Sequence, residues 1–220
     1  MENRLFDLFK KIESGKDKTP SQPVTYMLVG LGNPGREYTF TRHNTGFLAM
    51  DYLSQKLGVT VDRAKFHALC GEAVISGKRV LLMKPQTYMN GSGEAVREAA
   101  DFYKIPPENI LVLCDDVTLE VGCLRVRRKG SDGGQRGLRN IIEQLGSDAF
   151  PRIRIGIGKK PHPDYDLAAW VLSEFTKREQ EELFSLFGDV ENGVERILAG
   201  DIDGAMQTCN ARRPSGGERA

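Results

Sequence analysis

The sequence has no apolar run that approaches the ~18 residues needed to cross a membrane. It also lacks the short apolar core of a secretory signal peptide. Its four cysteines form neither a CxxC motif nor a zinc-ligand spacing. Three of them, Cys70, Cys114 and Cys123, lie in apolar, strand-like runs, where we expect buried free thiols. We therefore expect a cytoplasmic protein in a reducing compartment, with no membrane segment and no bound metal.

An excess of charge of either sign is also missing. The chain has 31 basic and 30 acidic side chains and a net charge of +1. Such a chain has no global field to attract nucleic acid, so any such signal must be local. One local bias lies between residues 125 and 160, where ten arginines and lysines face three acids. This basic stretch fits either a nucleic-acid phosphate backbone or a solvated strand face.

The length of 220 residues suits one sizeable domain with small appendages. Apolar residues at 5, 8, 9 and 12 fall on one helical face, and the sequence GKDKTPSQP that follows is typical of a linker. We therefore expect an amphipathic extension at 1–24, a domain at 25–210 and a disordered tail at 211–220. The extension fits a short helix docked on the domain or, given Lys10 and Lys11, an anchor on a membrane surface.

Apolar runs that end in turn residues predict strands at 26–29, 66–75, 79–83, 110–116, 123–130 and 152–158. Residues 76–78 predict a hairpin turn. Helical apolar periods predict a helix at 45–57, which Gly58 ends, and a second helix that Asn90 or Ser92 caps and that runs to about 104. They also predict helices at about 137–145 and over the C-terminal part. Strands that alternate with helices, plus one hairpin, predict an α/β fold, a single three-layer α/β/α domain with a twisted mixed sheet.

The stretch 26–44, YMLVGLGNPGREYTFTRHN, joins a buried-type strand to a loop rich in polar and titratable side chains. Open α/β sheets keep their sites at such carboxyl ends of strands. The glycines at 30, 32 and 35 match a dinucleotide fingerprint, but Asn33-Pro34 interrupts the helix that a pyrophosphate site needs. The acidic residue at the right distance, Asp51, lies in a predicted helix. A nucleotide cofactor is therefore a distant alternative, and we expect no cofactor.

Two further strands end in polar loops, one with Asn90 and one with Asp115 and Asp116. If the three loops share one sheet edge, His43 held by Asp115 through one ring nitrogen can accept a proton on the other. Because no GxSxG nucleophile elbow is present, water is the natural nucleophile and His43 its candidate base. Asn33 and Asn90 are candidate donors to a substrate carbonyl or its oxyanion. The alternatives are structural, since turn asparagines, loop histidines and helix-capping aspartates need no function.

Five motifs follow one another along residues 26–200: VGLGNPG (29–35), Tyr38-x4-His43-Asn44-x-Gly46, KPQTYMN (84–90), Asp115-Asp116, and GSDGG (130–134) with Gly137-Leu138. In order and spacing they resemble the bacterial-type peptidyl-tRNA hydrolase family. The resemblance implies a monomeric α/β/α protein that hydrolyses the ester joining a peptide to the terminal adenosine of tRNA, without metal or cofactor. It also implies the release of tRNA after aborted translation, and no obligate protein partner.

The resemblance further implies a role for each matching residue. His43 is similar in position to the catalytic base, and Asp115 to its orienting partner. Asn33 resembles the residue that engages the substrate beside the scissile ester and favours peptidyl over free aminoacyl substrates, while Asn90 resembles a binder of the peptide backbone. Tyr38 and Tyr88 resemble aromatic residues of the substrate cleft. The basic stretch then fits the tRNA acceptor stem and its 5′ phosphate.

One motif departs from the family. Where the family usually has His-Asn-Gly after two glycines, this chain has Gln135-Arg136-Gly137. The family's asparagine helps to place the attacking water, whereas Arg136 can donate hydrogen bonds but not accept them. We expect Arg136 to contact a phosphate or a carbonyl of the substrate. The departure also leaves open a protein that binds RNA without turnover, as a relative in chloroplast intron splicing does, although binding alone needs no general base.

Overall fold

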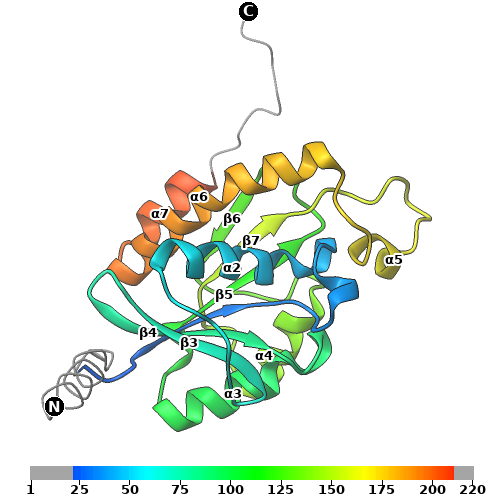
Figure 1. Cartoon of the computed structure of the whole chain (residues 1–220). Coiled ribbons are helices and arrows are strands. Elements are labelled where there is room, and N and C mark those ends of the chain that lie inside the picture. The colour runs from blue at the N-terminus through cyan, green and yellow to red at the C-terminus, as the bar shows by residue number, and fades with distance from the viewer. Residues whose placement is uncertain (1–21, 211–220) are drawn as a thin grey trace, which may run out of the picture.

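A seven-stranded mixed sheet forms the middle layer of the chain, with the order β2-β3-β4-β1-β5-β7-β6 (Figure 1). The computed structural model describes residues 22–210. Strands β4, β1, β5 and β7 run parallel, whereas β2, β3 and β6 are antiparallel to their neighbours. The strands are β1 (Tyr26–Gly30), β2 (Arg63–Lys65), β3 (Ala68–Ile75), β4 (Lys78–Pro85), β5 (Ile110–Asp116), β6 (Leu124–Arg127) and β7 (Arg152–Gly156).

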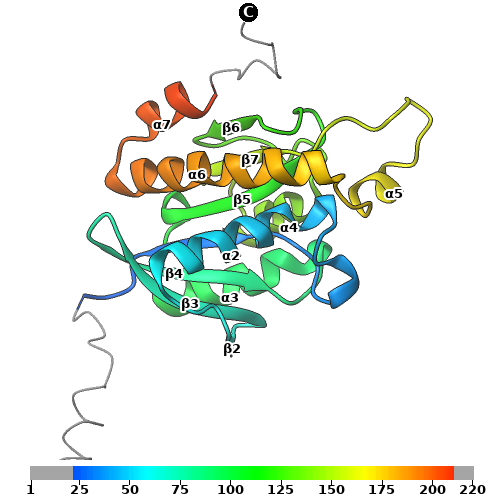
Figure 2. The same ribbon diagram turned by 45° about the horizontal axis from the view of Figure 1, so that its top comes forward.

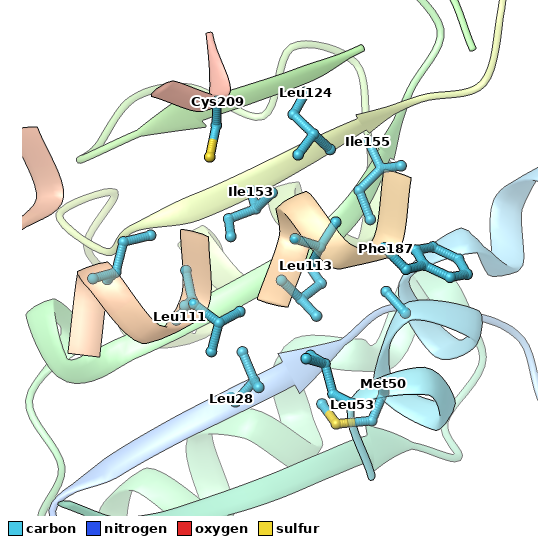
Figure 3. Packing of buried hydrophobic residues seen from close by; sticks show 14 of the residues in the cluster. Leu28, Met50, Leu53, Leu111, Leu113, Leu124, Ile153, Ile155, Phe187 and Cys209 are labelled. Atoms are coloured by element: carbon cyan, nitrogen blue, oxygen red, sulfur yellow. The ribbon is translucent and has the colours of Figure 1, made fainter. Parts of the chain in front are cut away.

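Helices cover both faces of the sheet, so the central strands are buried on both sides (Figure 2). Three helices, α2 (Thr45–Leu57), α6 (Lys177–Ala199) and α7 (Ile202–Cys209), pack on one face, and α3 (Ser92–Tyr103) and α4 (Arg136–Leu145) pack on the other. Successive side chains of a strand point to opposite faces of the sheet, so each apolar run contributes to both cores. Leu28 packs with α2 and α6 (Figure 3). Met27 and Val29 pack in the other core, with α3 and α4. The predicted three-layer α/β/α domain is confirmed.

The remaining elements are short and lie in the connections. They are the 3-10 helices η1 (Arg36–Tyr38), η2 (Arg42–Asn44), η3 (Met89–Gly91) and η4 (Pro107–Asn109), and helix α5 (Leu167–Val171). Gly46 lets η2 and the start of α2 approach the sheet closely. A Cβ atom at this position would lie 2.4 Å from the carbonyl oxygen of Leu113 and 2.5 Å from the backbone nitrogen of Leu31. The glycine thus brings the residues just before it against the ends of β1 and β5.

Most of the predicted elements are confirmed. Helix α2 has the predicted bounds and ends at Gly58 with a φ of 65°, and the β3–β4 hairpin turns at Ser76-Gly77. The predicted cap of the second helix is wrong, because the N-cap of α3 is Gly91 and the Ser92 hydroxyl donates to the Met89 carbonyl oxygen. The predicted extension before residue 22 and the predicted tail after residue 210 lie outside the described residues.

The prediction of buried thiols is right for Cys70 and Cys114 and wrong for Cys123, which is half-buried in the turn before β6. Burial raises the pKa of the Cys70 thiol to about 11 and that of the Cys114 thiol to about 12. Both therefore stay protonated and unreactive at neutral pH. Between residues 22 and 210, no helix is both long enough and apolar enough to span a bilayer.

Candidate active site

A cleft of about 440 Å³ opens beside the carboxyl ends of β1, β4 and β5. The three loops that follow these strands contribute to its wall, so the prediction that they share one edge of the sheet is confirmed. Helix α5 and the start of α4 form the other sides. Six of the seven predicted site residues line the cleft: Asn33, His43, Tyr88, Asn90, Asp115 and Arg136.

His43 and Asp115 are in direct contact, although they lie 72 positions apart in the chain. His43 Nδ1 is 2.9 Å from Asp115 Oδ2, and the side chains of both residues are largely buried. Because a carboxylate can only accept, the imidazole donates through Nδ1–H, and its Nε2 is the nitrogen left to take up a proton. Among residues 22–210, Nε2 has no hydrogen-bond partner.

The environment of His43 favours its protonation. Burial alone would lower the pKa of His43, but the charge of Asp115 and the hydrogen bond to it outweigh burial, and the pKa is raised above its ordinary value of 6.5. The positive charge of Arg136 lowers the pKa by a smaller amount. A histidine whose pKa is raised by a neighbouring carboxylate is suited to accept a proton.

Buried Arg42 fixes the turn that carries His43. Its guanidinium donates to both carboxylate oxygens of Glu179, at 2.8 and 3.0 Å, and to the Ile157 carbonyl oxygen at 2.7 Å. It also stacks 3.9 Å from the centroid of the Trp170 ring. These contacts tie η2 to the end of β7 and to α6, so the backbone of His43 is anchored by parts of the chain far away in sequence.

Asn33 is fixed by hydrogen bonds from two other loops. The Asn44 side chain accepts from the Asn33 backbone N–H at 2.8 Å and donates to the Asn33 carbonyl oxygen at 2.9 Å. The side-chain oxygen of Asn33 accepts from the Met89 backbone N–H at 2.8 Å. Its amide NH₂ group, which has no hydrogen-bond partner within residues 22–210, is therefore oriented as a donor at the cleft.

The two predicted aromatic residues differ in position. Tyr88 lines the cleft, is 57% exposed and has a φ of 56°, a strained conformation for a residue other than glycine. Tyr38 packs edge-on against Tyr88, with 6.4 Å between ring centroids, and is not among the cleft-lining residues of the described chain. Asn90, two residues after Tyr88 in η3, is exposed and lines the cleft. Tyr38 thus supports Tyr88 from outside the cleft.

Gln135 belongs to the site, although it was not among the predicted residues. Its side-chain Nε2 lies 3.0 Å from Asp115 Oδ1, and its Oε1 accepts from the Leu138 backbone N–H at 2.7 Å as the N-cap of α4. The sequence feature that could have identified it is its position just after Gly133-Gly134 and directly before an amphipathic helix. Arg136 follows as the first residue of α4 and is exposed at the cleft.

Asp116 does not cap a helix, contrary to the structural alternative. It lies at the end of β5, where its Oδ2 is 2.9 Å from Arg154 Nε as an ion pair without hydrogen-bond alignment, and its Oδ1 accepts from Thr118. The Arg154 guanidinium packs against the loop at Gly133-Gly134: a Cβ atom on Gly133 would lie 2.5 Å from Arg154 Nη1. The pair therefore supports the loop that leads to Gln135.

The basic stretch is only partly at the surface. Arg152 is 1% exposed and donates to the carbonyl oxygens of Gly130, Asp148 and Phe150, while Arg154 is held by Asp116. Both belong to β7, an interior strand, so an alternating pattern here does not mark a solvated face. The basic side chains that are exposed are Arg127, Arg128, Lys129, Arg136, Arg139 and Lys159.

Chemically, the cleft combines a histidine–carboxylate pair with amide donors and one arginine. This set can withdraw a proton from water and bind a carbonyl or an oxyanion. Across the described chain, no group of three or more His, Cys, Asp or Glu side chains is arranged to hold a metal ion.

Comparisons with known proteins point to one family. The family model described as peptidyl-tRNA hydrolase matches residues 27–216. The peptidyl-tRNA hydrolase of Caldicellulosiruptor bescii is 52% identical over 187 residues, which are 85% of this chain and 97% of the relative. That of Clostridium botulinum is 46% identical over 185 residues, 84% of this chain and 95% of the relative. The crystal structure of peptidyl-tRNA hydrolase from Acinetobacter baumannii matches with a TM-score of 0.81 at 36% identity, and the match covers 88% of this chain and 100% of that one.

Proposed function

The chain belongs to the peptidyl-tRNA hydrolase family, and we propose that it performs the family's reaction with His43 as the general base. The chain is a hydrolase of the ester bond in peptidyl-tRNA. The observation that carries the mechanism is the 2.9 Å contact between His43 Nδ1 and Asp115 Oδ2, which leaves Nε2 without a hydrogen-bond partner among the described residues.

The proposed reaction needs only water and the ester. Nε2 of His43 removes a proton from water while the water oxygen attacks the ester carbonyl carbon. Asp115 stabilises the imidazolium that forms. The tetrahedral intermediate then collapses, the bond to the 3′ oxygen of the terminal adenosine breaks, and the imidazolium returns its proton to that oxygen. The products are a free peptide carboxylate and an intact tRNA.

The amides of the cleft are suited to bind the substrate. We assign the NH₂ group of Asn33 to the substrate beside the scissile ester, where it would favour peptidyl over free aminoacyl substrates. Asn90 is assigned to the peptide backbone, and Tyr88, supported by Tyr38, to the wall of the cleft. Removing one donor from a developing oxyanion typically costs about 3–4 kcal/mol. These roles need neither a metal nor a cofactor.

The tRNA body is expected to lie along the exposed basic residues. Arg127, Arg128 and Lys129 sit on and after the edge strand β6, and Arg136 and Arg139 lie on α4. Their charges are suited to the acceptor stem and its 5′ phosphate, while the cleft takes the terminal adenosine and the peptide. We propose that the protein acts as a monomer in the cytoplasm, without an obligate protein partner, and recycles tRNA after aborted translation.

Hydrolysis in H₂¹⁸O tests the proposed reaction. Because water attacks the carbonyl carbon, the released peptide is expected to carry one ¹⁸O in its carboxylate, and the 3′ hydroxyl of the tRNA none. Mass spectrometry of both products, with acid-quenched enzyme analysed in parallel, measures this. Label in the tRNA, or a peptide adduct on His43, would contradict general-base hydrolysis. Bound tRNA with no released peptide would instead identify an RNA-binding protein.

Arg136→Ala and Arg136→Asn are expected to raise KM more than they lower kcat. Loss of a hydrogen bond to a charged group is worth about 1.5–3 kcal/mol, or roughly ten- to a hundredfold in KM. Because the charge of Arg136 lowers the pKa of His43, both substitutions should also move the acid limb of the pH–rate profile to higher pH. Steady-state kinetics across pH measures both effects.

Arg139→Ala is the matched control for the shift of the acid limb, because Arg139 belongs to the same basic surface as Arg136. This arginine lies on the same helix, is exposed and pairs with Asp132, but is not among the described residues that line the cleft. The control is expected to leave the acid limb in place. If the Arg136 variants change neither KM nor the acid limb, Arg136 is a bystander.

A further inference from the structure

Gln135 lies between the histidine–carboxylate pair and helix α4, and it has no role in the proposed mechanism. The residue is 5% exposed, and both the nitrogen and the oxygen of its side-chain amide are hydrogen-bonded. Nε2 is 3.0 Å from Asp115 Oδ1 and 3.1 Å from Met89 Sδ, while Oε1 accepts from the Leu138 N–H. Because this buried amide is fully hydrogen-bonded, breaking any of its hydrogen bonds is costly, and the side chain is held rigidly beside His43 and Asp115.

The orientation of this amide is fixed by the chemistry of its two partners. The backbone N–H of Leu138 can only donate, so the oxygen of Gln135 must face it. The Asp115 carboxylate can only accept, so the NH₂ group must face Asp115. A flipped amide would lose both hydrogen bonds at once. The N-terminus of α4 therefore determines which group Gln135 presents to Asp115.

Both oxygens of Asp115 are consequently occupied. Oδ2 accepts from His43 and Oδ1 accepts from Gln135. A carboxylate bonded through one oxygen can swing about its Cβ–Cγ bond, because this terminal torsion is soft. The second hydrogen bond restricts that rotation, and so it holds Oδ2 in the direction of the Nδ1–H donor.

Gln135 also acts without adding charge. The charged groups that face His43 are Asp115 from β5, Arg136 from α4 and, around the cleft, the Asp116–Arg154 ion pair and Asp166 before α5. A cationic donor at position 135 would offset part of the attraction between Asp115 and His43. A neutral amide leaves the full negative charge of Asp115 acting on the imidazole.

We propose that Gln135 is a positioning residue for the reaction, and that its amide couples the N-terminus of α4 to the Asp115 carboxylate that orients His43. The proposal rests on His43 as the general base. The contribution that we propose for Gln135 passes through Asp115, the member of the pair to which its amide donates.

Gln135→Asn separates this role from helix capping. Asparagine is among the best N-cap residues, but its side chain is shorter by one carbon–carbon bond, about 1.5 Å, and its amide cannot reach Asp115 while it caps α4. We expect kcat to fall about ten- to a hundredfold with KM unchanged, as for a misplaced catalytic group. We also expect the titration midpoint of His43, followed by NMR of the imidazole, to fall, because a mobile Asp115 stabilises the imidazolium less.

The chain supplies its own controls for this experiment. His67 and His162 are its only other histidines, and their imidazole NMR signals should be the same in the variant as in the wild type. Asn140→Ala removes a comparable side-chain acceptor from α4, the one for the Gly93 N–H, at a distance from Asp115. That variant should lower thermal stability and leave both kcat and the His43 midpoint unchanged. A Gln135→Asn protein with the wild-type kcat and His43 midpoint would show that Gln135 only caps the helix.

Wild-type protein provides a second measurement that does not depend on the variant folding. The side-chain NH₂ resonances of Gln135 should shift with the same midpoint as His43, because the imidazolium polarises Asp115, and signals that do not follow His43 would overturn the proposal. Failure of the general-base mechanism is recognised separately, by a His43→Ala enzyme that keeps its rate. If His43→Ala is inactive while Gln135→Asn behaves as wild type, only the role of Gln135 is lost.

Discussion

Asp115→Asn is expected to lower kcat for hydrolysis of peptidyl-tRNA about 10³- to 10⁴-fold. In serine-protease triads, the corresponding change from aspartate to asparagine lowers kcat about 10⁴-fold by imposing the wrong histidine tautomer. We expect the wrong histidine tautomer here as well, because Gln135 donates a hydrogen bond to Oδ1, the oxygen of Asp115 that His43 does not use. Gln135 presents an NH₂ group to Oδ1, because its own oxygen is held by Leu138.

The amide that Asp115→Asn introduces would have to accept the hydrogen bond that Gln135 donates. Its oxygen would accept from Gln135, so its NH₂ group would face His43 Nδ1 and force that nitrogen to accept. Nε2 would then carry the imidazole proton and could not remove one from water. Asp115→Ala imposes no tautomer, so we expect Asp115→Asn to be the more damaging of the two, although it is the more conservative in shape.

The measurement is kcat for both variants at a pH well above the His43 titration, where protonation of the base cannot explain a loss. Imidazole ¹⁵N shifts report the tautomer directly and should show a proton on Nδ1 in wild type and on Nε2 in Asp115→Asn. An Asp115→Asn enzyme more active than Asp115→Ala would contradict this account of the pair.

His43→Ala is expected to lower the rate of peptide release about 10²- to 10⁴-fold, the range that a positioned general base contributes. Its neighbours offer no substitute, because Asp116 is paired with Arg154 and Asp166 caps α5. Single-turnover release of tRNA measures the loss. His43→Gln, whose amide can still donate to Asp115 but cannot act as a base, should be as inactive as His43→Ala.

His67→Ala is the control, since this histidine is 75% exposed in its side chain and pairs with Glu98 on the surface. We expect it to leave the rate unchanged. A similar loss in His67→Ala would indicate a general effect of removing a histidine.

Much of the scaffold was predictable because local signals agree with the tertiary structure. The run Ile110–Asp116 is apolar up to its two carboxylates, and it forms a central strand with those carboxylates at its end. The apolar face of 45–57 and the stop at Gly58 predicted α2 with its observed bounds. These elements also predicted which loops meet, because parallel strands deliver their carboxyl ends to one edge.

The contact between His43 and Asp115 could not be derived from their spacing. It depends on β1 lying beside β5, and on Gly46 allowing η2 to approach that edge. Gln135 was missed for a similar reason. From the sequence it was a departure from a motif, and its partner Asp115 becomes visible only when α4 is placed over the end of β5.

The basic stretch was partly misinterpreted because charge alone does not distinguish an exposed arginine from a buried one. Arg152 and Arg154 alternate with isoleucine as they would on a half-exposed strand, but β7 lies between β5 and β6. The Arg152 guanidinium donates to backbone carbonyl oxygens, and that of Arg154 forms an ion pair with Asp116. The tRNA footprint that we propose is therefore smaller than the sequence indicated, and it is centred on β6 and α4.

Release of intact tRNA from an N-blocked aminoacyl-tRNA, followed for wild type and His43→Ala across the pH range in which histidine titrates, tests the central claim most directly. The wild-type rate should fall as the pH drops through a midpoint above 6.5, because the raised pKa of His43 is crossed there and the base becomes protonated. His43→Ala should bind tRNA normally yet lose both the rate and this acid limb. An equal, negligible rate in both proteins with tRNA still bound, or an undiminished rate in His43→Ala, would contradict the claim that His43 is the base of a working hydrolase.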